Sequence, residues 1–255
     1  MQLKRAYLWL ILAAFVSPFI VLGLLSVSKG WFFPDVLPQQ FTIEYWSRLF
    51  SSQSGLGGSF LLSIGIALTV ALVSTLAGYF TSKQIAYHAK GNQLILLAYL
   101  PFSMAPVIYA ACIHYFFIRA NLDGNVLGVM LGQFIITYPF AVLVLIGHWN
   151  SNIKSLEELV QTLGGNKLQA FTKVMLPVSK GILLVCFFQT FLISWFEYGL
   201  TSVIGVGKVQ TLTIQVYRYI GEANIYQAAL SSCLLMLPPV MLLWLNKKYI
   251  FTKPV

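Results

Sequence analysis

The sequence predicts an all-α membrane protein with six transmembrane helices. Hydrophobic residues make up 58% of the 255-residue chain and charged residues only 9%, and the mean hydropathy is +0.79. A water-soluble domain would carry about 25% charged residues. Crossing a ~30 Å hydrocarbon layer takes about 20 apolar helical residues, and six runs are long enough. The predicted spans, within one domain covering residues 1–255, are Ala6–Val27, Phe60–Ser82, Gln93–Phe117, Val126–His148, Gly181–Leu200 and Gln227–Leu245.

The first run is predicted to be a span and not a cleaved signal peptide. Lys4 and Arg5 precede it and Ser26-Val27-Ser28 follow it, as in a signal sequence. The apolar core of a signal peptide has only about 7–15 residues, however, and this run is longer. We therefore expect it to cross the membrane as the first helix.

Prolines stand inside four of the predicted spans. Each removes a backbone donor and pushes against the preceding helical turn, so we expect these helices to kink. The prolines are Pro18 in the first span, Pro101 and Pro106 in the third, Pro139 in the fourth, and Pro238 and Pro239 in the sixth. In the second span, the small residues Ser74 and Gly78 predict a close contact with another helix.

The positive charges predict the orientation of the bundle. With both termini in the cytoplasm, the 16 lysines and arginines divide 11 to 5 between the inner and outer sides. This is the asymmetry of the positive-inside rule. The inner cations are Lys4, Arg5, Lys83, Lys90, Lys154, Lys167, Lys173, Lys180, Lys247, Lys248 and Lys253. Because the net charge of +9 is spread over membrane loops in this way, we expect no nucleic-acid partner.

The longest inner loop, Trp149–Lys180, is predicted to contain a helix with one apolar side. Apolar residues recur there at i, i+3, i+4 and i+7, which places them on one face of a helix. They are Leu156, Leu159, Val160 and Leu163. Such a stripe is stable only when another surface covers it.

Polar residues and glycines predict the ends of this helix. Ser155, with Glu158 three residues later, has the pattern of a capping box, so the helix is predicted to begin there. Gly164-Gly165 is predicted to end it, because glycine accepts a left-handed conformation without a Cβ clash. A second helix is predicted over Asn166–Lys173, and Pro177 is predicted to break it before the fifth span.

The same loop resembles the EAA loop of ABC importer permeases, written E-A-A-x-x-x-G-x9-I-x-L-P. The residues that match at the right spacing are Glu158, Gly164, Leu176 and Pro177. Leu159 and Val160 stand in place of the two alanines, and Val174 in place of isoleucine. Two other stretches, Phe41–Trp46 and Leu100–Pro106, resemble permeases of the polyamine and ferric-iron group.

This resemblance implies a six-helix fold with a cytoplasmic EAA helix-turn-helix loop and both termini in the cytoplasm. It implies a multi-pass permease of the bacterial inner membrane that forms half of a pathway for a small solute, such as a polyamine, ferric iron or thiamine. The implied partners are cytoplasmic ABC ATPase subunits, a second permease of a different sequence and a periplasmic substrate-binding protein. ATP hydrolysis is expected on the separate ATPase, so this chain is not expected to be an enzyme.

Two acidic residues each have two interpretations. Glu158 either only caps its helix or also, as the resemblance implies, pairs with a basic residue of the ATPase. Glu197 is the only acidic residue within a predicted span, where an ionisable group is costly unless it faces a cavity or a partner. It therefore either lines the substrate pathway or reaches water, since it lies near the outer end of the fifth span.

The chain has no P-loop, no H-E-x-x-H zinc pair and no potassium-filter glycine loop. We therefore expect no cofactor, no metal site and no catalytic residue. The three cysteines, Cys112, Cys186 and Cys233, fall within predicted spans as small packing residues. The alternative function is a secondary transporter or channel that works without an ATPase. Such proteins usually carry several ionisable groups in repeated halves, whereas only Glu197 and His114 are candidates here.

Overall fold

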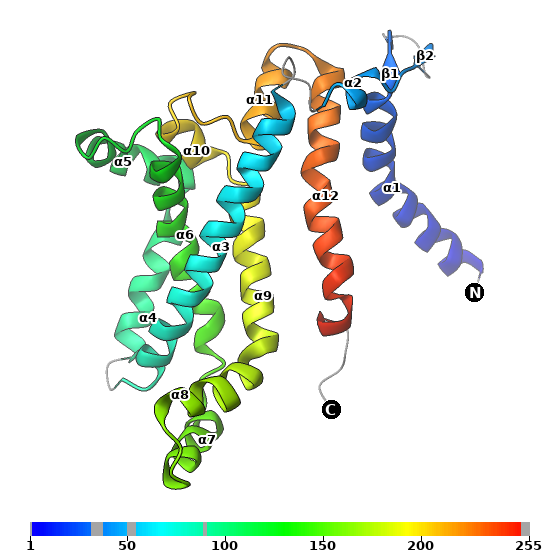
Figure 1. Ribbon diagram of the computed structural model, residues 1–255. Coiled ribbons are helices and arrows are strands. Elements are labelled where there is room, and N and C mark those ends of the chain that lie inside the picture. Colours follow the sequence, from blue (N-terminus) through cyan, green and yellow to red (C-terminus); the bar gives the residue numbers. More distant parts are fainter. Residues whose placement is uncertain (1, 32–37, 50–54, 89–90, 251–255) are drawn as a thin grey trace. The chain divides into compact units, whose positions relative to one another are not determined.

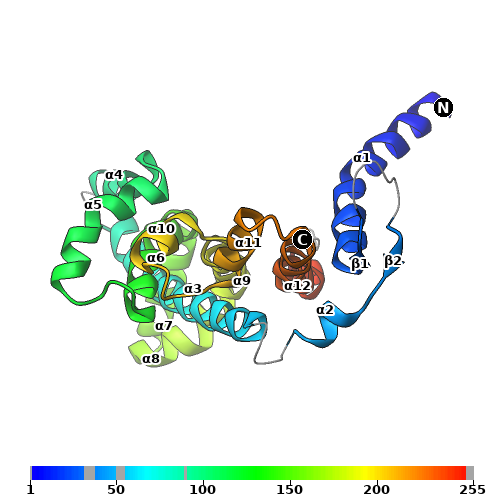
Figure 2. The ribbon, with the colours of Figure 1, turned by 90° about the horizontal axis from the view of Figure 1, so that it is seen from above.

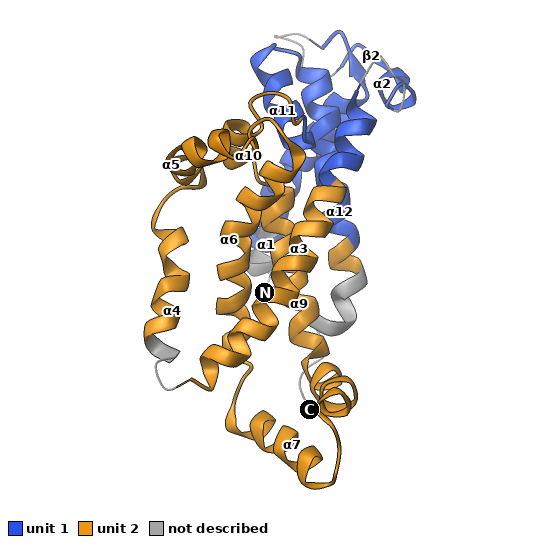
Figure 3. Ribbon diagram, turned by 60° about the vertical axis from the view of Figure 1, so that its left-hand side comes forward, with its two compact units in different colours: residues 1–63, 210–241 blue, residues 64–209, 242–255 orange. Residues whose placement is uncertain are grey.

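The computed structural model describes residues 2–31, 38–49, 55–88 and 91–250. The predicted cytoplasmic termini, residue 1 and residues 251–255, lie outside these ranges. The chain forms two compact units, residues 1–63 with 210–241 (unit 1) and residues 64–209 with 242–255 (unit 2; Figure 3). Nearly all of the described secondary structure is helical, as the composition predicts.

Unit 1 contains the first and last long helices and a small antiparallel strand pair. Its elements are α1 (Gln2–Ser26), β1 (Ser28–Lys29), β2 (Gln40–Phe41), α2 (Glu44–Ser47), the first turns of α3 (Leu56–Ala86), α11 (Leu212–Gly221) and most of α12 (Ile225–Ile250). The strands pair Ser28 with Phe41 and Lys29 with Gln40. The Tyr226 hydroxyl accepts a hydrogen bond from the amide of Trp31 at 2.6 Å and so ties the strand pair to α12.

Unit 2 contains the rest of α3 and the middle of the chain. Its elements are α4 (Gly91–Tyr99), the 3₁₀ helix η1 (Leu100–Ser103), α5 (Pro106–Arg119), α6 (Val126–Ile146), α7 (Ser151–Thr162), α8 (Lys167–Gln169), the π-helix η2 (Ala170–Met175), α9 (Leu176–Trp195) and α10 (Gly199–Ile204). The long helices α3, α6 and α9 run side by side (Figure 1). Figure 2 shows α4 and α5 at the edge of this unit, on the side of α6.

Small and hydroxylated residues bring α3 close to α6 and α9, as Ser74 and Gly78 predict. A Cβ added to Gly78 would lie 2.7 Å from the Cβ of Ala141 on α6, closer than real Cβ atoms approach. The Ser74 hydroxyl lies 2.7 Å from that of Thr137 on α6. Hydroxyl pairs and small residues of this kind hold helices together where lipid supplies no hydrophobic drive.

Among the described residues, five helices are long and apolar enough to cross a membrane, and a bent pair of helices supplies a sixth span if the two are counted as one. The predicted third span, residues 93–117, is not one straight helix, because Gln93–Ser103 and Pro106–Arg119 meet at 98°, where a kink at Pro101 and Pro106 is expected. Ala105 is extended, with ψ 143°, since the ring of Pro106 disfavours a helical conformation in the residue before it. The bend therefore arises from the local backbone conformation at Ala105 and Pro106.

Other prolines do not interrupt their helices. The helices α1, α6 and α12 run through Pro18, Pro139 and Pro238-Pro239. The predicted break at Pro177 is wrong, because residues 167–195 form one continuous membrane-length helix. In the π turn before Pro177, the amide of Leu176 donates to the carbonyl of Phe171, five residues back. A wider turn of this type accommodates the proline ring.

Candidate functional site

The loop between α6 and α9 is a helix-turn-helix at one end of unit 2. Figures 1 and 3 show α7 beyond the ends of α6 and α9. The Asn150 side chain caps α7 by accepting a hydrogen bond from the amide of Ile153 at 3.0 Å. Asn166 and Gln169 form a capping box at the start of α8, where the second helix is predicted. Both helices therefore begin at an asparagine, which is among the best N-cap residues.

The predicted capping box of Ser155 and Glu158 is wrong. Asn150 starts α7 about one turn earlier, and the Ser155 hydroxyl instead donates to the Ser151 carbonyl at 3.0 Å. Glu158 lies within the helix, with its carboxylate 3.9 Å from the ammonium group of Lys154. The capping interpretation of Glu158 is therefore excluded by the helix start.

The predicted glycine stop of α7 is confirmed. Gly164 has φ +80°, in the left-handed region, and a Cβ placed on it would meet nothing within 4 Å. The amide of Gly165 donates to the carbonyl of Val160 at 2.9 Å, and that of Gly164 to Gln161 at 3.1 Å. These two bonds form a Schellman motif, which satisfies the last carbonyls of a helix and turns the chain.

A buried aromatic cluster fixes this loop to the bundle. It is built around Trp149, whose indole N–H donates to the Ser82 hydroxyl of α3 at 2.8 Å. The Trp149 and Tyr79 rings meet edge to face, with centroids 4.9 Å apart. The buried residues of the cluster are Tyr79, Ala141, Leu145, Trp149, Ile153, Met175 and Cys186. No sequence pattern identified this anchor, although a tryptophan at the boundary of the fourth span is a usable signal.

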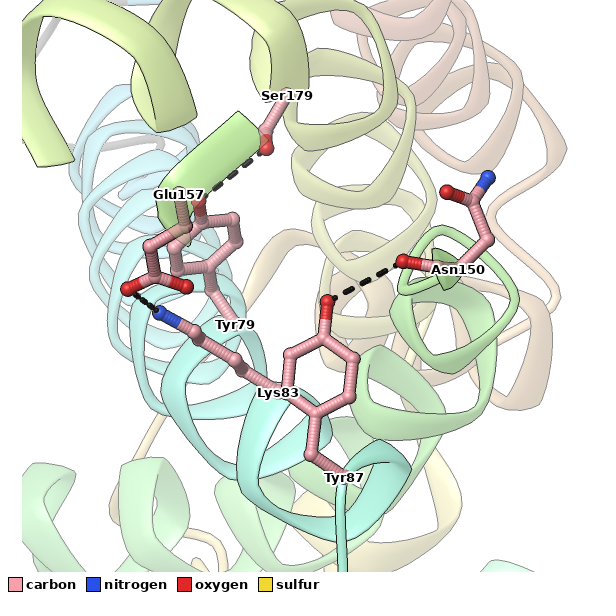
Figure 4. A network of polar contacts seen from close by, with 6 residues as sticks. All are labelled: Tyr79, Lys83, Tyr87, Asn150, Glu157 and Ser179. Carbon is pink, nitrogen blue, oxygen red and sulfur yellow. Dashed lines mark hydrogen bonds and ion pairs between the residues drawn. The ribbon is translucent and has the colours of Figure 1, made fainter. Parts of the chain in front are cut away.

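Polar contacts surround the anchor (Figure 4). The ammonium group of Lys83 on α3 lies 2.6 Å from the carboxylate of Glu157 on α7. The Tyr87 hydroxyl donates to the Asn150 carbonyl at 3.5 Å. Burial, and then the negative charge of Glu157, raise the pKa of Tyr87 above its usual value. A second chain of contacts places the His148 ring 2.8 Å from the Ser179 hydroxyl, and burial lowers the pKa of this histidine.

The anchor covers only part of the predicted apolar stripe. Ile153 is buried and Val160 is half-buried, so this side of α7 faces the bundle. Leu156, Leu159 and Leu163 remain 39%, 54% and 79% exposed. Three leucines of α7 are therefore exposed at the surface, while the opposite side of the helix is packed against the bundle.

Two other residues of the motif lie on a different surface. Leu176 and Pro177, in the first turn of α9, line a groove of about 600 Å³ between α3 and α9. The remaining members of the predicted site belong to α7 or to the turn after it. The helix-turn-helix therefore brings together Leu156, Glu158, Leu159, Val160, Leu163 and Gly164, without Leu176 and Pro177.

Glu197 lies in the turn between α9 and α10, just beyond the span helix. One carboxylate oxygen accepts from the amide of Leu200 at 2.6 Å, and the other accepts from the amide of Thr201 at 2.8 Å and from its hydroxyl at 2.5 Å. Gln133 of α6 donates to the Thr201 hydroxyl at 3.0 Å and accepts from Ser194 at 2.5 Å. Both oxygens of Glu197 are thus engaged within the protein.

This network borders a pocket of about 380 Å³. The polar residues that line it are Gln133, Thr137, Ser194 and Glu197, and the rest of the lining is mostly apolar. The volume falls in the range of about 300–1,000 Å³ typical of small-molecule sites. Within the described ranges, no three His, Cys, Asp or Glu side chains are grouped to hold a metal ion.

Comparison with known proteins relates the chain to uptake permeases, although no family model matches it. It is 26% identical to the maltose/maltodextrin transport system permease protein MalG of Escherichia coli, over 85% of this chain and 80% of MalG. It is 24% identical to the osmoprotective compounds uptake permease protein GgtD of Synechocystis, over 97% of this chain and 86% of GgtD. It is 30% identical to the chloroplastic sulfate permease 2 of Chlamydomonas reinhardtii, but the match spans only 46% of that protein.

A solved structure with the same fold is a chain of a bacterial ABC transporter involved in the import of the acidic polysaccharide alginate. The TM-score is 0.66 at 16% identity, over 98% of this chain and 95% of that chain. The predicted all-α, multi-pass inner-membrane protein is confirmed, whereas the narrower polyamine and ferric-iron group is not. The chain has the fold of an ABC importer permease, and its sequence relatives are permease components of uptake systems.

Proposed function

We propose that this chain is a permease subunit of an ABC importer, forming half of the translocation pathway for a small solute. A separate cytoplasmic ATPase binds the loop around α7 and supplies the energy. A second permease of different sequence completes the pathway, and a periplasmic protein delivers the solute. The relatives named as permeases and the fold shared with an ABC transporter support this assignment.

The observation that carries the proposal is the half-covered stripe of α7. Leu156, Leu159 and Leu163 stay exposed while a buried cluster fixes the helix, so they form a surface suited to a partner. Residues of an α-helix follow one another at about 100°, which places Glu158 on the other side of α7 from Leu156. An ATPase that contacts both the leucines and Glu158 therefore has a groove that encloses the helix.

The proposed orientation places α7 and both termini in the cytoplasm. The 11-to-5 division of cations supports it. An ATPase can then reach α7, since ATP is a cytoplasmic substrate. Binding of the ATPase to α7 in inside-out vesicles, and not to right-side-out vesicles, checks this orientation together with the docking surface.

Replacing Gly164 with valine is expected to weaken ATPase binding about tenfold. A β-branched residue in the left-handed region costs roughly 1–2 kcal/mol, and 1.4 kcal/mol corresponds to a factor of ten. An added Cβ meets no atom within 4 Å, so the strain comes from the left-handed backbone of the turn. The measurement is the affinity of the purified permease for the ABC ATPase of the same transport system.

The matched control is Gly181→Val in α9, where the backbone is helical and the space around an added Cβ is also empty. It is expected to bind the ATPase like the wild type. Equal affinities of the Gly164→Val and Gly181→Val proteins would contradict the role of the turn. If the wild-type permease does not bind the ATPase at all, the proposed function itself is overturned.

The substrate we propose is a small solute that a periplasmic protein binds first. The resemblance of Phe41–Trp46 and Leu100–Pro106 to polyamine and ferric-iron permeases supports those solutes or thiamine, while the relatives transport maltose, osmoprotective compounds or sulfate. Screening these solutes against the binding protein of the same transport system identifies the class. Uptake of the solute that binds is then the assay for the variants below.

Glu197 is proposed to line the solute pathway, because its network borders the pocket lined by α5, α6 and the end of α9. Glu197→Gln is expected to lower uptake while insertion and ATPase binding stay normal. Glutamine keeps the size of the side chain but offers only one acceptor oxygen to the two amides of α10. Uptake at the wild-type rate would remove Glu197 from the pathway and leave it as a support of α10.

A further inference from the structure

The ion pair between Lys83 and Glu157 joins two helices that are far apart in the sequence. Lys83 lies in the last turn of α3, and Glu157, 74 residues later, lies on α7. The charged atoms are 2.6 Å apart, and the side chains are only 28% and 23% exposed. A pair shielded to this extent is less weakened by salt than a surface pair.

Neighbouring groups fix the position of Lys83. Its ammonium group lies 5.9 Å from the centre of the Trp149 ring, within the range of a cation–π interaction. Its place in the last turn of α3 is also favourable, because a helix C-terminus attracts a positive charge. Figure 4 shows the lysine and the carboxylate of Glu157 directed toward each other beside Tyr79 and Tyr87.

The pair lies away from the proposed docking surface. Glu157 follows Leu156 by one residue, or about 100° around α7, and is further still from Leu159 and Leu163. The side chain of Glu157 is directed to α3, while the three leucines are exposed. Removing the pair therefore leaves the docking surface of α7 unchanged.

The connection of α7 to α3 differs from its connections to α6 and α9. The chain itself joins α7 to α6 and, through α8 and η2, to α9. The contacts described between α7 and α3 are made through side chains, and the bond from Trp149 to Ser82 acts on the residue before the cap of α7. A force on the body of α7 reaches α3 through contacts such as that of Glu157.

We propose that Lys83 and Glu157 are a positioning pair, which makes α3 move together with α7 when the ATPase changes state. This inference rests on the proposed function. Loss of either charge frees α7 to move without α3, so that ATPase binding persists while movement of the span is lost.

The experiment measures the distance between α7 and α3 in the complete transporter. Spin labels are placed at Gln161 on α7, away from the three exposed leucines, and at Leu76 on α3, both exposed, after replacement of the three native cysteines. The distance is compared in the nucleotide-free state and with ATP and vanadate. In the wild type we expect the same distance in both states. In Lys83→Met and Glu157→Gln we expect it to change.

A reversed pair tests the contact itself. The double variant Lys83→Glu with Glu157→Lys is expected to restore the constant distance. The control reverses an exposed pair on α11, Arg218→Glu with Glu222→Arg, and is expected to behave as the wild type. A merely structural role would lower the thermal stability of the single variants and their ATPase binding together, with no change in the distance between the two states.

The inference is overturned if the wild-type distance changes with nucleotide, if it stays constant in both single variants, or if the reversed pair does not restore it. If the wild-type permease does not bind the ATPase at all, the proposed function fails instead. If the ATPase binds but α3 and α7 do not move together, only the proposed role of the Lys83–Glu157 pair fails.

Discussion

Replacing Trp149 with alanine is expected to detach α7 from the bundle. Trp149 lies at the centre of the buried cluster and donates a hydrogen bond to Ser82. Truncation of a buried tryptophan typically costs about 3–5 kcal/mol. The expected result is faster proteolysis in the turn between α7 and α8 and loss of the ATPase from the purified complex, while the long helices stay inserted.

Phenylalanine at position 149 separates packing from hydrogen bonding. Trp149→Phe keeps an aromatic ring next to Tyr79 but lacks the indole N–H, a loss of about 1 kcal/mol. The Ser82 hydroxyl still donates to the Tyr79 carbonyl at 3.0 Å, so it keeps a partner. This variant is expected to retain most ATPase. Proteolysis of Trp149→Ala at the wild-type rate would show that other contacts are sufficient to fix α7.

Replacing Glu158 with glutamine is expected to leave the fold intact and to weaken ATPase binding at least a hundredfold. The carboxylate does not cap α7, and its contact with Lys154 is an exposed i,i+4 pair worth only about 0.3–0.5 kcal/mol. A charge that becomes buried against a cation of the ATPase is different, because loss of one partner costs about 3–5 kcal/mol. Calorimetric titration of the permease with the ATPase measures the difference.

The control for this change is Lys154→Gln, which removes the intrahelical pair and keeps the charge of Glu158. It is expected to bind the ATPase as the wild type does, with the same thermal unfolding midpoint. If Glu158→Gln also binds and transports normally, the charge-pairing hypothesis is wrong. The exposed leucines would then account for docking without it.

Local signals made the turn after α7 predictable. Gly164 predicts a left-handed residue because glycine has no Cβ, and this requirement holds whatever surrounds the turn. The start of α7 depends on a competition between two capping residues instead. Ser155 and Asn150 both have suitable side chains, and Asn150 prevails because the helix can then include Ile153, which packs into the anchor. Burial of that isoleucine depends on the tertiary structure.

The long-range parts of the site could not be predicted from sequence patterns. Nothing near Lys83 or Glu157 indicates that they meet, because the contact depends on how α7 folds back toward α3. That Glu197 has partners within the protein was partly predictable, since an acidic residue near a span points to a function or a partner. Its carboxylate accepts hydrogen bonds from two amides of α10, and this depends on where α9 ends, at Trp195.

The π turn of η2 determines the direction in which α7 presents its leucines. Such a turn contains one residue more than the α-helical turn that it replaces, and each residue rotates a helix by about 100°. Residues 167–195 are otherwise one continuous helix. If this stretch were α-helical throughout, α8 and α7 would point in a different direction around the axis of α9. The direction of the proposed docking surface therefore depends on the number of residues between Gly165 and Pro177, in addition to the contacts that hold α7 to the bundle.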